Sequence, residues 1–120
     1  MRPVEKLDVY RLSRQVAVRV CILCDRPPLK SRWSITDQIL RASMSVPANI
    51  AEGYALGTRP QMVKFFRIAF ASNEELRTHF EVILESRILD AQDPDLATEM
   101  PRVASMLVGL LKRYGARPSP

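Results

Sequence analysis

The segment RASMSVPANIAEGY, residues 41–54, carries a proline and an asparagine inside a pattern that otherwise predicts a strong helix. At about 100° per residue, the polar side chains fall in one narrow stripe: Gln38, Arg41, Ser45, Asn49 and Glu52. The remaining positions are almost all apolar or small. Because a surface helix of a monomeric bundle shows a broad polar face instead, we expect this helix to be buried on more than one side.

Pro47 supports the same interpretation. It removes one helical hydrogen bond and leaves the carbonyl of Ser43 without its usual donor, a defect that persists where packing or a nearby polar group compensates. We interpret part of the stripe as a polar ladder that satisfies its own hydrogen bonds in apolar surroundings. The ladder consists of Arg41, Ser45, Asn49 and Glu52, with Glu75 expected to pair with Arg41 across the bundle. The alternative is that the stripe is the solvent face of an unusually apolar helix.

The whole chain has the composition of a single globular domain. It has 120 residues, of which 47% are hydrophobic and 26% charged. No apolar run approaches the roughly 18 residues of a membrane span, and the N-terminus lacks the apolar core of a signal peptide. We therefore expect a cytoplasmic protein without membrane contact, with one domain over residues 1–115 and a disordered tail at residues 116–120.

Periodicity and helix-breaking residues divide the chain into four helices. We expect them at residues 4–24, 34–53 or 34–57, 58–89 and 93–114. Pro60 and Pro94 fall in the first turns of the last two helices, where proline is favoured, and Thr58 with Gln61 predicts a capping box. Pro101 either kinks the last helix or marks its real start.

Three of these helices show the seams of shallow-angle helix packing. The clearest seam alternates spacings of four and three: Met62, Phe66, Ala69, Asn73, Leu76, Phe80 and Ile83. The last helix repeats the pattern with Val103, Leu107, Leu110 and Tyr114. The first helix presents Leu7, Tyr10, Ala17, Cys21 and Cys24, flanked by Leu12, Val16, Val20 and Leu23. Short connections favour antiparallel neighbours, so the predicted fold is an all-α, up-down antiparallel four-helix bundle.

A bundle of this size has too little interior to cover the apolar helix around Pro47 by itself. Contiguous exposed apolar surface usually marks an interface. We therefore expect another copy of the chain to cover this helix, and the sequence predicts a homo-oligomer.

Four blocks of the sequence, in order, resemble one family. They are LDVYRLS, TDQILRASMSVPANIAEGYALG, FFRIAFASNEELRT and MLVGLLKR, of which SVPANIAEG is the most specific part. From about Leu7 to Arg113 the chain is similar to the four-helix-bundle family of 23S rRNA intervening sequence proteins. The resemblance implies a bundle that assembles as a ring-like homopentamer. That family is also similar in fold to the basic accessory variability determinant of diversity-generating retroelements, which works with a reverse transcriptase and its template RNA.

The chain departs from the family pattern at one position of the third block. Where the family usually reads ARGS, this sequence reads Ala69-Phe70-Ala71-Ser72, so Phe70 replaces an arginine. Any role of that arginine in the family therefore does not transfer to this chain.

The charge is unevenly distributed along the predicted bundle. The formal net charge is +5 and the sequence pI is about 9.7, values that permit nucleic-acid binding without requiring it. One end of an up-down bundle would collect ten cations against three acids, and the opposite end six against eight. The cations of this basic end are Arg2, Lys6, Arg11, Arg14, Arg59, Lys64, Arg67, Lys112, Arg113 and Arg117.

The helix at residues 58–89 places its cations against its own dipole. Arg59, Lys64 and Arg67 lie near its N-terminus, where a helix dipole favours acids. Phosphates, or acidic residues of a neighbouring subunit, would favour such cations. With no recognised base-reading motif, we expect contacts mainly to phosphates of RNA or DNA. The candidate nucleic-acid-binding residues are Arg11, Arg14, Arg59, Lys64, Arg67, Lys112 and Arg113.

A competing interpretation assigns these cations to a solvated face. The protein would then be a structural homo-oligomeric scaffold or a protein-interaction module with no nucleic-acid role.

Catalysis finds little support in the residue pattern. His79 lies on the packed side of its helix, four residues from Glu75, which favours a core or interface histidine over a catalyst. Cys21 and Cys24 are at most half a zinc site, so we expect no bound metal, no cofactor and no enzymatic activity.

Overall fold

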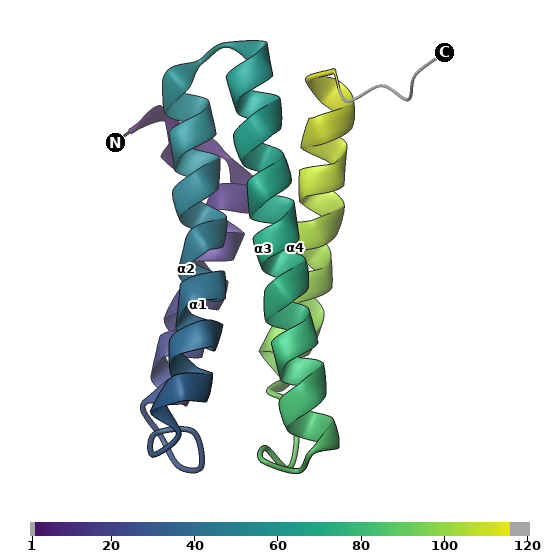
Figure 1. The fold of residues 1–120 in the computed structure, drawn as a ribbon. Coiled ribbons are helices and arrows are strands. Elements are labelled where there is room, and N and C mark those ends of the chain that lie inside the picture. Colours follow the sequence, from purple (N-terminus) through teal and green to yellow (C-terminus); the bar gives the residue numbers. More distant parts are fainter. Residues whose placement is uncertain (1, 116–120) are drawn as a thin grey trace.

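The computed structural model describes residues 2–115, which form one short 3₁₀ helix and four α-helices (Figure 1). The elements are η1 (Pro3–Lys6), α1 (Asp8–Cys24), α2 (Trp33–Leu56), α3 (Arg59–Glu85) and α4 (Pro94–Arg113). Consecutive α-helices run in opposite directions, and α2 and α4 each pack against both α1 and α3. The predicted all-α antiparallel bundle is confirmed. The expected disordered tail lies outside the described residues.

The helix ends follow the local chemistry of their residues. Gly57 adopts a left-handed conformation with φ of 77°, and this ends α2 at the later of the two predicted glycines. Asp93 caps α4, because its Oδ1 accepts hydrogen bonds from the backbone N–H groups of Asp95 and Leu96 at 2.8 and 3.1 Å. Pro94 then occupies the first helical position, as predicted.

Other predicted boundaries are wrong. The first helix is broken at Leu7, whose extended backbone separates η1 from α1. Helix α3 ends at Glu85 rather than near residue 89, since Arg87 turns the chain with φ of 61°. The side chain of Thr58 makes no capping bond, so the predicted capping box does not form. Helix α4 runs continuously through Pro101, which is therefore not its start.

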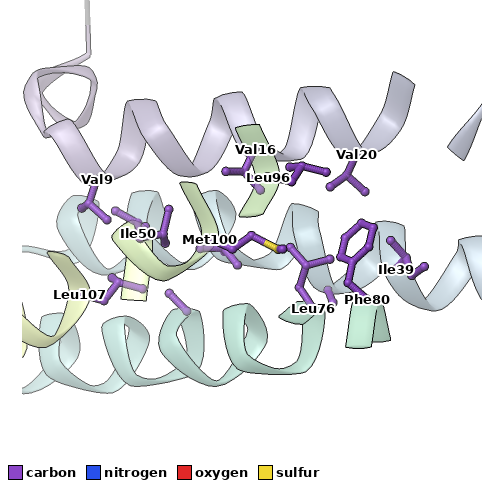
Figure 2. Packing of buried hydrophobic residues seen from close by; sticks show 14 of the residues in the cluster. Val9, Val16, Val20, Ile39, Ile50, Leu76, Phe80, Leu96, Met100 and Leu107 are labelled. Atoms are coloured by element: carbon purple, nitrogen blue, oxygen red, sulfur yellow. The ribbon is translucent and has the colours of Figure 1, made fainter. Parts of the chain in front are cut away.

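The core lies between the four α-helices. Figure 2 shows side chains from all four, among them Val16, Ile50, Leu76 and Met100, meeting in one interior. All seven residues of the predicted α3 seam are buried, so this prediction is confirmed in full. Asn73 is the polar member of the seam, and its Nδ2 donates to the carbonyl of Met100 at 3.0 Å. This buried bond ties α3 to α4.

The predicted core face of α1 is correct only in part. Its buried residues are Val9, Tyr10, Ser13, Val16, Ala17, Val20 and Cys24. Cys21 is exposed, contrary to the prediction. The packing of both α2 and α4 against α1 centres the buried face on Val16 and Val20, which leaves Cys21 at its edge.

Gly53 lies at a tight contact between α2 and α3. A Cβ built at Gly53 would lie 2.9 Å from the Cβ of Phe65 and 3.4 Å from Cε1 of Phe66. The separation of the two Cβ atoms is below 3.0 Å, and each is bonded directly to its backbone, so a side chain at Gly53 would push the two helices apart. Gly53 therefore serves helix packing and does not end α2.

We expect Gly53→Ala to destabilise the fold by about 1–3 kcal/mol, since overpacking a tight contact forces the two helices apart. Gly109→Ala is the matched control, because Gly109 lies in α4 with no atom within 4 Å of a built Cβ. There the same change should stabilise by roughly 0.5–1 kcal/mol through helix propensity. Urea unfolding followed by circular dichroism measures both; equal effects at the two positions would contradict this account.

Candidate nucleic-acid interface

The basic end of the bundle is brought together by its topology. The start of α1, the turn between α2 and α3, and the end of α4 all lie at the same end, at the top of Figure 1. Within residues 2–115 this end holds nine of the ten predicted cations, against the acids Glu5, Asp8 and Glu52. Arg117 lies outside the described residues.

The ring of Tyr10 on α1 lies beside two of these cations. The guanidinium of Arg14 lies 5.5 Å from the centre of the Tyr10 ring, and that of Arg2 lies 5.7 Å from it. Arg2 also donates from Nη2 to the Tyr10 hydroxyl at 2.7 Å. Arg11 is less available, because it pairs with Asp8 and donates from Nη1 to the carbonyl of Glu5 at 2.7 Å.

One cation of α3 and one of α4 also lie over aromatic rings. The ammonium of Lys64 lies 5.5 Å from the Phe65 ring centre, and the guanidinium of Arg113 lies 5.6 Å from that of Tyr114. Tyr114 in turn packs edge-on against buried Phe66, with ring centres 6.1 Å apart. Arg59 lines a shallow hollow beside Tyr114. These stacked contacts reduce the freedom of long side chains before any ligand binds.

Most of the candidate cations have no acidic partner. Among residues 2–115, six of the seven candidates form no ion pair: Arg14, Arg59, Lys64, Arg67, Lys112 and Arg113. At the opposite end, by contrast, Arg19 pairs with Asp95 at 3.2 Å and with Glu99 at 2.9 Å. Unpaired cations of this kind can bind phosphate oxygens. The candidates surround one end of the bundle and do not share a single helix face.

The polar ladder is divided between protein contacts and solvent. Ser45 and Asn49 are half-buried: the Ser45 hydroxyl lies 2.8 Å from that of Ser72 on α3, and Asn49 Nδ2 donates to the carbonyl and the hydroxyl of Ser45 at 2.7 and 2.9 Å. Arg41 and Glu52 are exposed in the single chain. Cover of these two residues by a second subunit stays a prediction.

The predicted pair of Arg41 with Glu75 is wrong for the single chain. Arg41 Nε instead bonds to Asp37 Oδ2 at 2.9 Å, one turn earlier on its own helix, a spacing that favours such pairs. Glu75 lies 3.8 Å from His79 Nε2, also on its own helix. His79 thus stands beside a carboxylate, as expected for a packed histidine.

The structure also reveals an apolar groove between α1 and α2 that the sequence interpretation missed. Its lining includes Cys21, Val18 and Ile22 from α1 and Met44 and Pro47 from α2. The spacing of Val18 and Ile22, one turn apart and off the core face, was the available signal. The groove leaves open, in the single chain, the flank of Pro47 that the sequence predicted to need cover.

The two cysteines differ in environment. Burial, with a smaller contribution from the neighbouring Cys21, raises the pKa of Cys24 from 9.0 to about 11. Cys21 is exposed in the groove.

Within residues 2–115, no group of three or more histidine, cysteine or acidic side chains is placed to hold a metal ion. No helix of that part of the chain is long and apolar enough to cross a membrane.

Fold and surface together define a small four-helix bundle protein with one basic end. The family model described as 23S rRNA-intervening sequence protein matches residues 5–109, and the chain belongs to that family. A solved structure from Bacteroides thetaiotaomicron VPI-5482, described as a protein with unknown function from the S23 ribosomal protein family, is similar in fold. The two share 20% identity with a TM-score of 0.78, over 87% of this chain and 95% of that one. No match was found among the curated proteins.

We expect a thiol reagent at pH 8 to modify Cys21 much faster than Cys24. The thiolate is the reactive form, and a pKa of about 11 leaves Cys24 almost fully protonated at that pH. Mass spectrometry after peptide digestion locates the label, and Cys21→Ser serves as the control that should remove the fast phase. Equal labelling of both cysteines in the folded protein would contradict the burial of Cys24.

Proposed function

We propose that this protein is a non-enzymatic, oligomeric nucleic-acid-binding accessory protein that contacts the phosphate backbone of RNA or DNA through its basic end. The observation that carries the proposal is the set of unpaired cations held on aromatic rings at that end. The helix dipole of α3 opposes the cations at its N-terminus, by some tenths of a kcal/mol each. A bound polyanion would offset that cost.

Assembly would increase the strength of such binding. A ring of copies, a homopentamer as the family resemblance implies, repeats the basic end around one rim. One nucleic-acid strand then contacts several copies, and each further contact is intramolecular. The partner process would involve RNA handling, with a reverse transcriptase as one candidate partner by the same resemblance.

The alternative function is a structural homo-oligomeric scaffold or a protein-interaction module without nucleic-acid binding. The apolar groove between α1 and α2 supports it, since contiguous exposed apolar surface marks interaction sites. Salt-dependent binding of unrelated RNA and DNA separates the two functions, because a scaffold needs no affinity for phosphate.

We expect Arg59, Lys64 and Arg67 replaced together by Glu to abolish binding of a fluorescent RNA or DNA oligonucleotide at low salt. For the unaltered protein, the plot of log K against log salt should slope steeply downward, by roughly one for each phosphate contacted. Fluorescence anisotropy over a series of salt concentrations measures both quantities.

The matched control replaces Arg26, Lys30 and Arg32 by Glu, an equal change of charge in the loop at the opposite end. This control should keep most of the affinity and the slope. Equal losses in the two variants would mean that net charge alone attracts the strand. Unchanged affinity in the first variant would remove these three residues from the interface.

A further inference from the structure

The groove between α1 and α2 has two apolar compartments. The lower one is about 480 Å³ in volume and contains Val18, Ile22 and Met44, which are 54%, 47% and 57% exposed. The upper one, about 330 Å³, is lined by apolar side chains at the start of the chain and the end of α2, including Tyr54. The two are continuous, because Arg2 and Ala51 line both.

Two cations lie near the junction of the compartments: Arg2 lines both, and Arg14 lines the lower one. Both stand over the ring of Tyr10. No acidic side chain lines either compartment, and Arg14 has no ion-pair partner within residues 2–115. From one end to the other, the groove is therefore apolar, cationic and apolar again.

The outer face of α3 carries the complementary pattern. Ile68 and Val82 are 38% and 55% exposed, and the side chain of Glu75 between them is 60% exposed. These three residues, which we call the α3 ridge, follow one another at intervals of seven residues, or about 10.5 Å along a helix. On the groove side, Arg14 and Cys21 are also seven residues apart on α1. The ridge is apolar, anionic and apolar, and Glu75 and Val82 have the same spacing along their helix as Arg14 and Cys21.

We propose that the groove of one copy receives the α3 ridge of a second copy, with Glu75 of one chain paired with Arg14 of the other. The interface rests on the proposed homo-oligomer and identifies its contact surfaces. It assigns Arg14 to the contact between copies, which leaves phosphate binding to the other candidate cations. Because groove and ridge are different surfaces of one chain, the contact is head-to-tail, and repetition closes a ring where the rotation permits. Each copy of α2 then has its Pro47 flank covered, as the sequence predicted.

The orientation follows from the proposed rim. If all basic ends face the same way, α3 of the neighbour runs parallel to α1. Val82 then enters the lower compartment beside Cys21 and Ile22, and Ile68 enters the upper one beside Tyr54. This arrangement also brings Lys64 of the neighbour toward the basic end of the first copy, so a polyanion at the rim would strengthen assembly.

Charge reversal tests the central pair. Arg14→Glu and Glu75→Arg should each weaken self-association roughly tenfold or more, since each places like charges in contact. The double variant should recover most of the loss, because the pair is restored with opposite sign. Size exclusion with light scattering over a concentration series measures assembly, and Arg102→Glu, an exposed α4 residue outside both surfaces, is the charge-matched control.

The outcomes separate this interface from the proposed oligomer itself. A protein that is monomeric throughout overturns both. An oligomer that both single reversals leave intact, or that Arg102→Glu weakens equally, overturns the groove-and-ridge contact and leaves the oligomer standing. Loss in each single variant with recovery in the double variant supports the contact.

Cross-linking tests the orientation independently. In Val82→Cys, a short bis-maleimide should link the introduced thiol to the native Cys21 of a second copy, giving covalent dimers and, because the contact is head-to-tail, larger covalent multimers on a denaturing gel. Ile68→Cys should give few such dimers, and Cys21→Ser should remove those of Val82→Cys. Dimers from Ile68→Cys in place of Val82→Cys would overturn the parallel arrangement.

Discussion

The close contact of α2 with α3 at Gly53 is the constraint on which the basic end depends. Because Gly53 has no side chain, Phe65 and Phe66 lie directly against α2. Phe66 then supports the ring of Tyr114, and Phe65 supports the ammonium of Lys64. The absence of a side chain at Gly53 thus helps to position Lys64 on α3 and, through Tyr114, Arg113 on α4.

Helices α3 and α4 differ in how their charges are placed relative to the helix dipole, and this difference shows which cations stabilise their own helix. Helix α4 follows the helix dipole, with Asp93 and Asp95 at its start and Lys112 and Arg113 in its last turn. Helix α3 has no acid in its first turn and begins with Arg59. The cations at the end of α4 stabilise their helix whether or not a ligand binds, whereas those at the start of α3 destabilise theirs unless an anion is bound. The α3 cations are therefore the stronger argument for an anionic partner.

The narrow polar stripe and broad apolar surface of helix α2 follow from its packing between α1 and α3. One flank meets α3, where the half-buried Ser45 hydroxyl bonds to that of Ser72 and Asn49 donates to Ser45. The other flank meets α1 and leaves an apolar groove that includes Pro47. The narrow polar stripe is therefore neither a fully buried ladder nor an ordinary solvent face. Its middle is satisfied by α3, and its ends, Arg41 and Glu52, reach solvent in the single chain.

The sequence by itself determined the features that depend on short-range spacing. The α3 seam from Met62 to Ile83 was predictable because a helix that packs at a shallow angle repeats its contacts every three or four residues. The start of α4 at Asp93 was predictable because capping acts locally, and local sequence limited the end of α2 to Gly53 or Gly57, of which the structure has Gly57. The gathering of cations at one end followed from the order of antiparallel helices.

Only the tertiary structure decided how far each helix turns toward its neighbours. Cys21 lies outside the core and Val9 inside it because the packing of α2 and α4 sets the buried face of α1. The Arg41–Asp37 pair, by contrast, is local, and its i,i+4 spacing in the sequence could have predicted it. The groove likewise depends on how α1 and α2 pack together, and spacing within either helix cannot reveal the space between them.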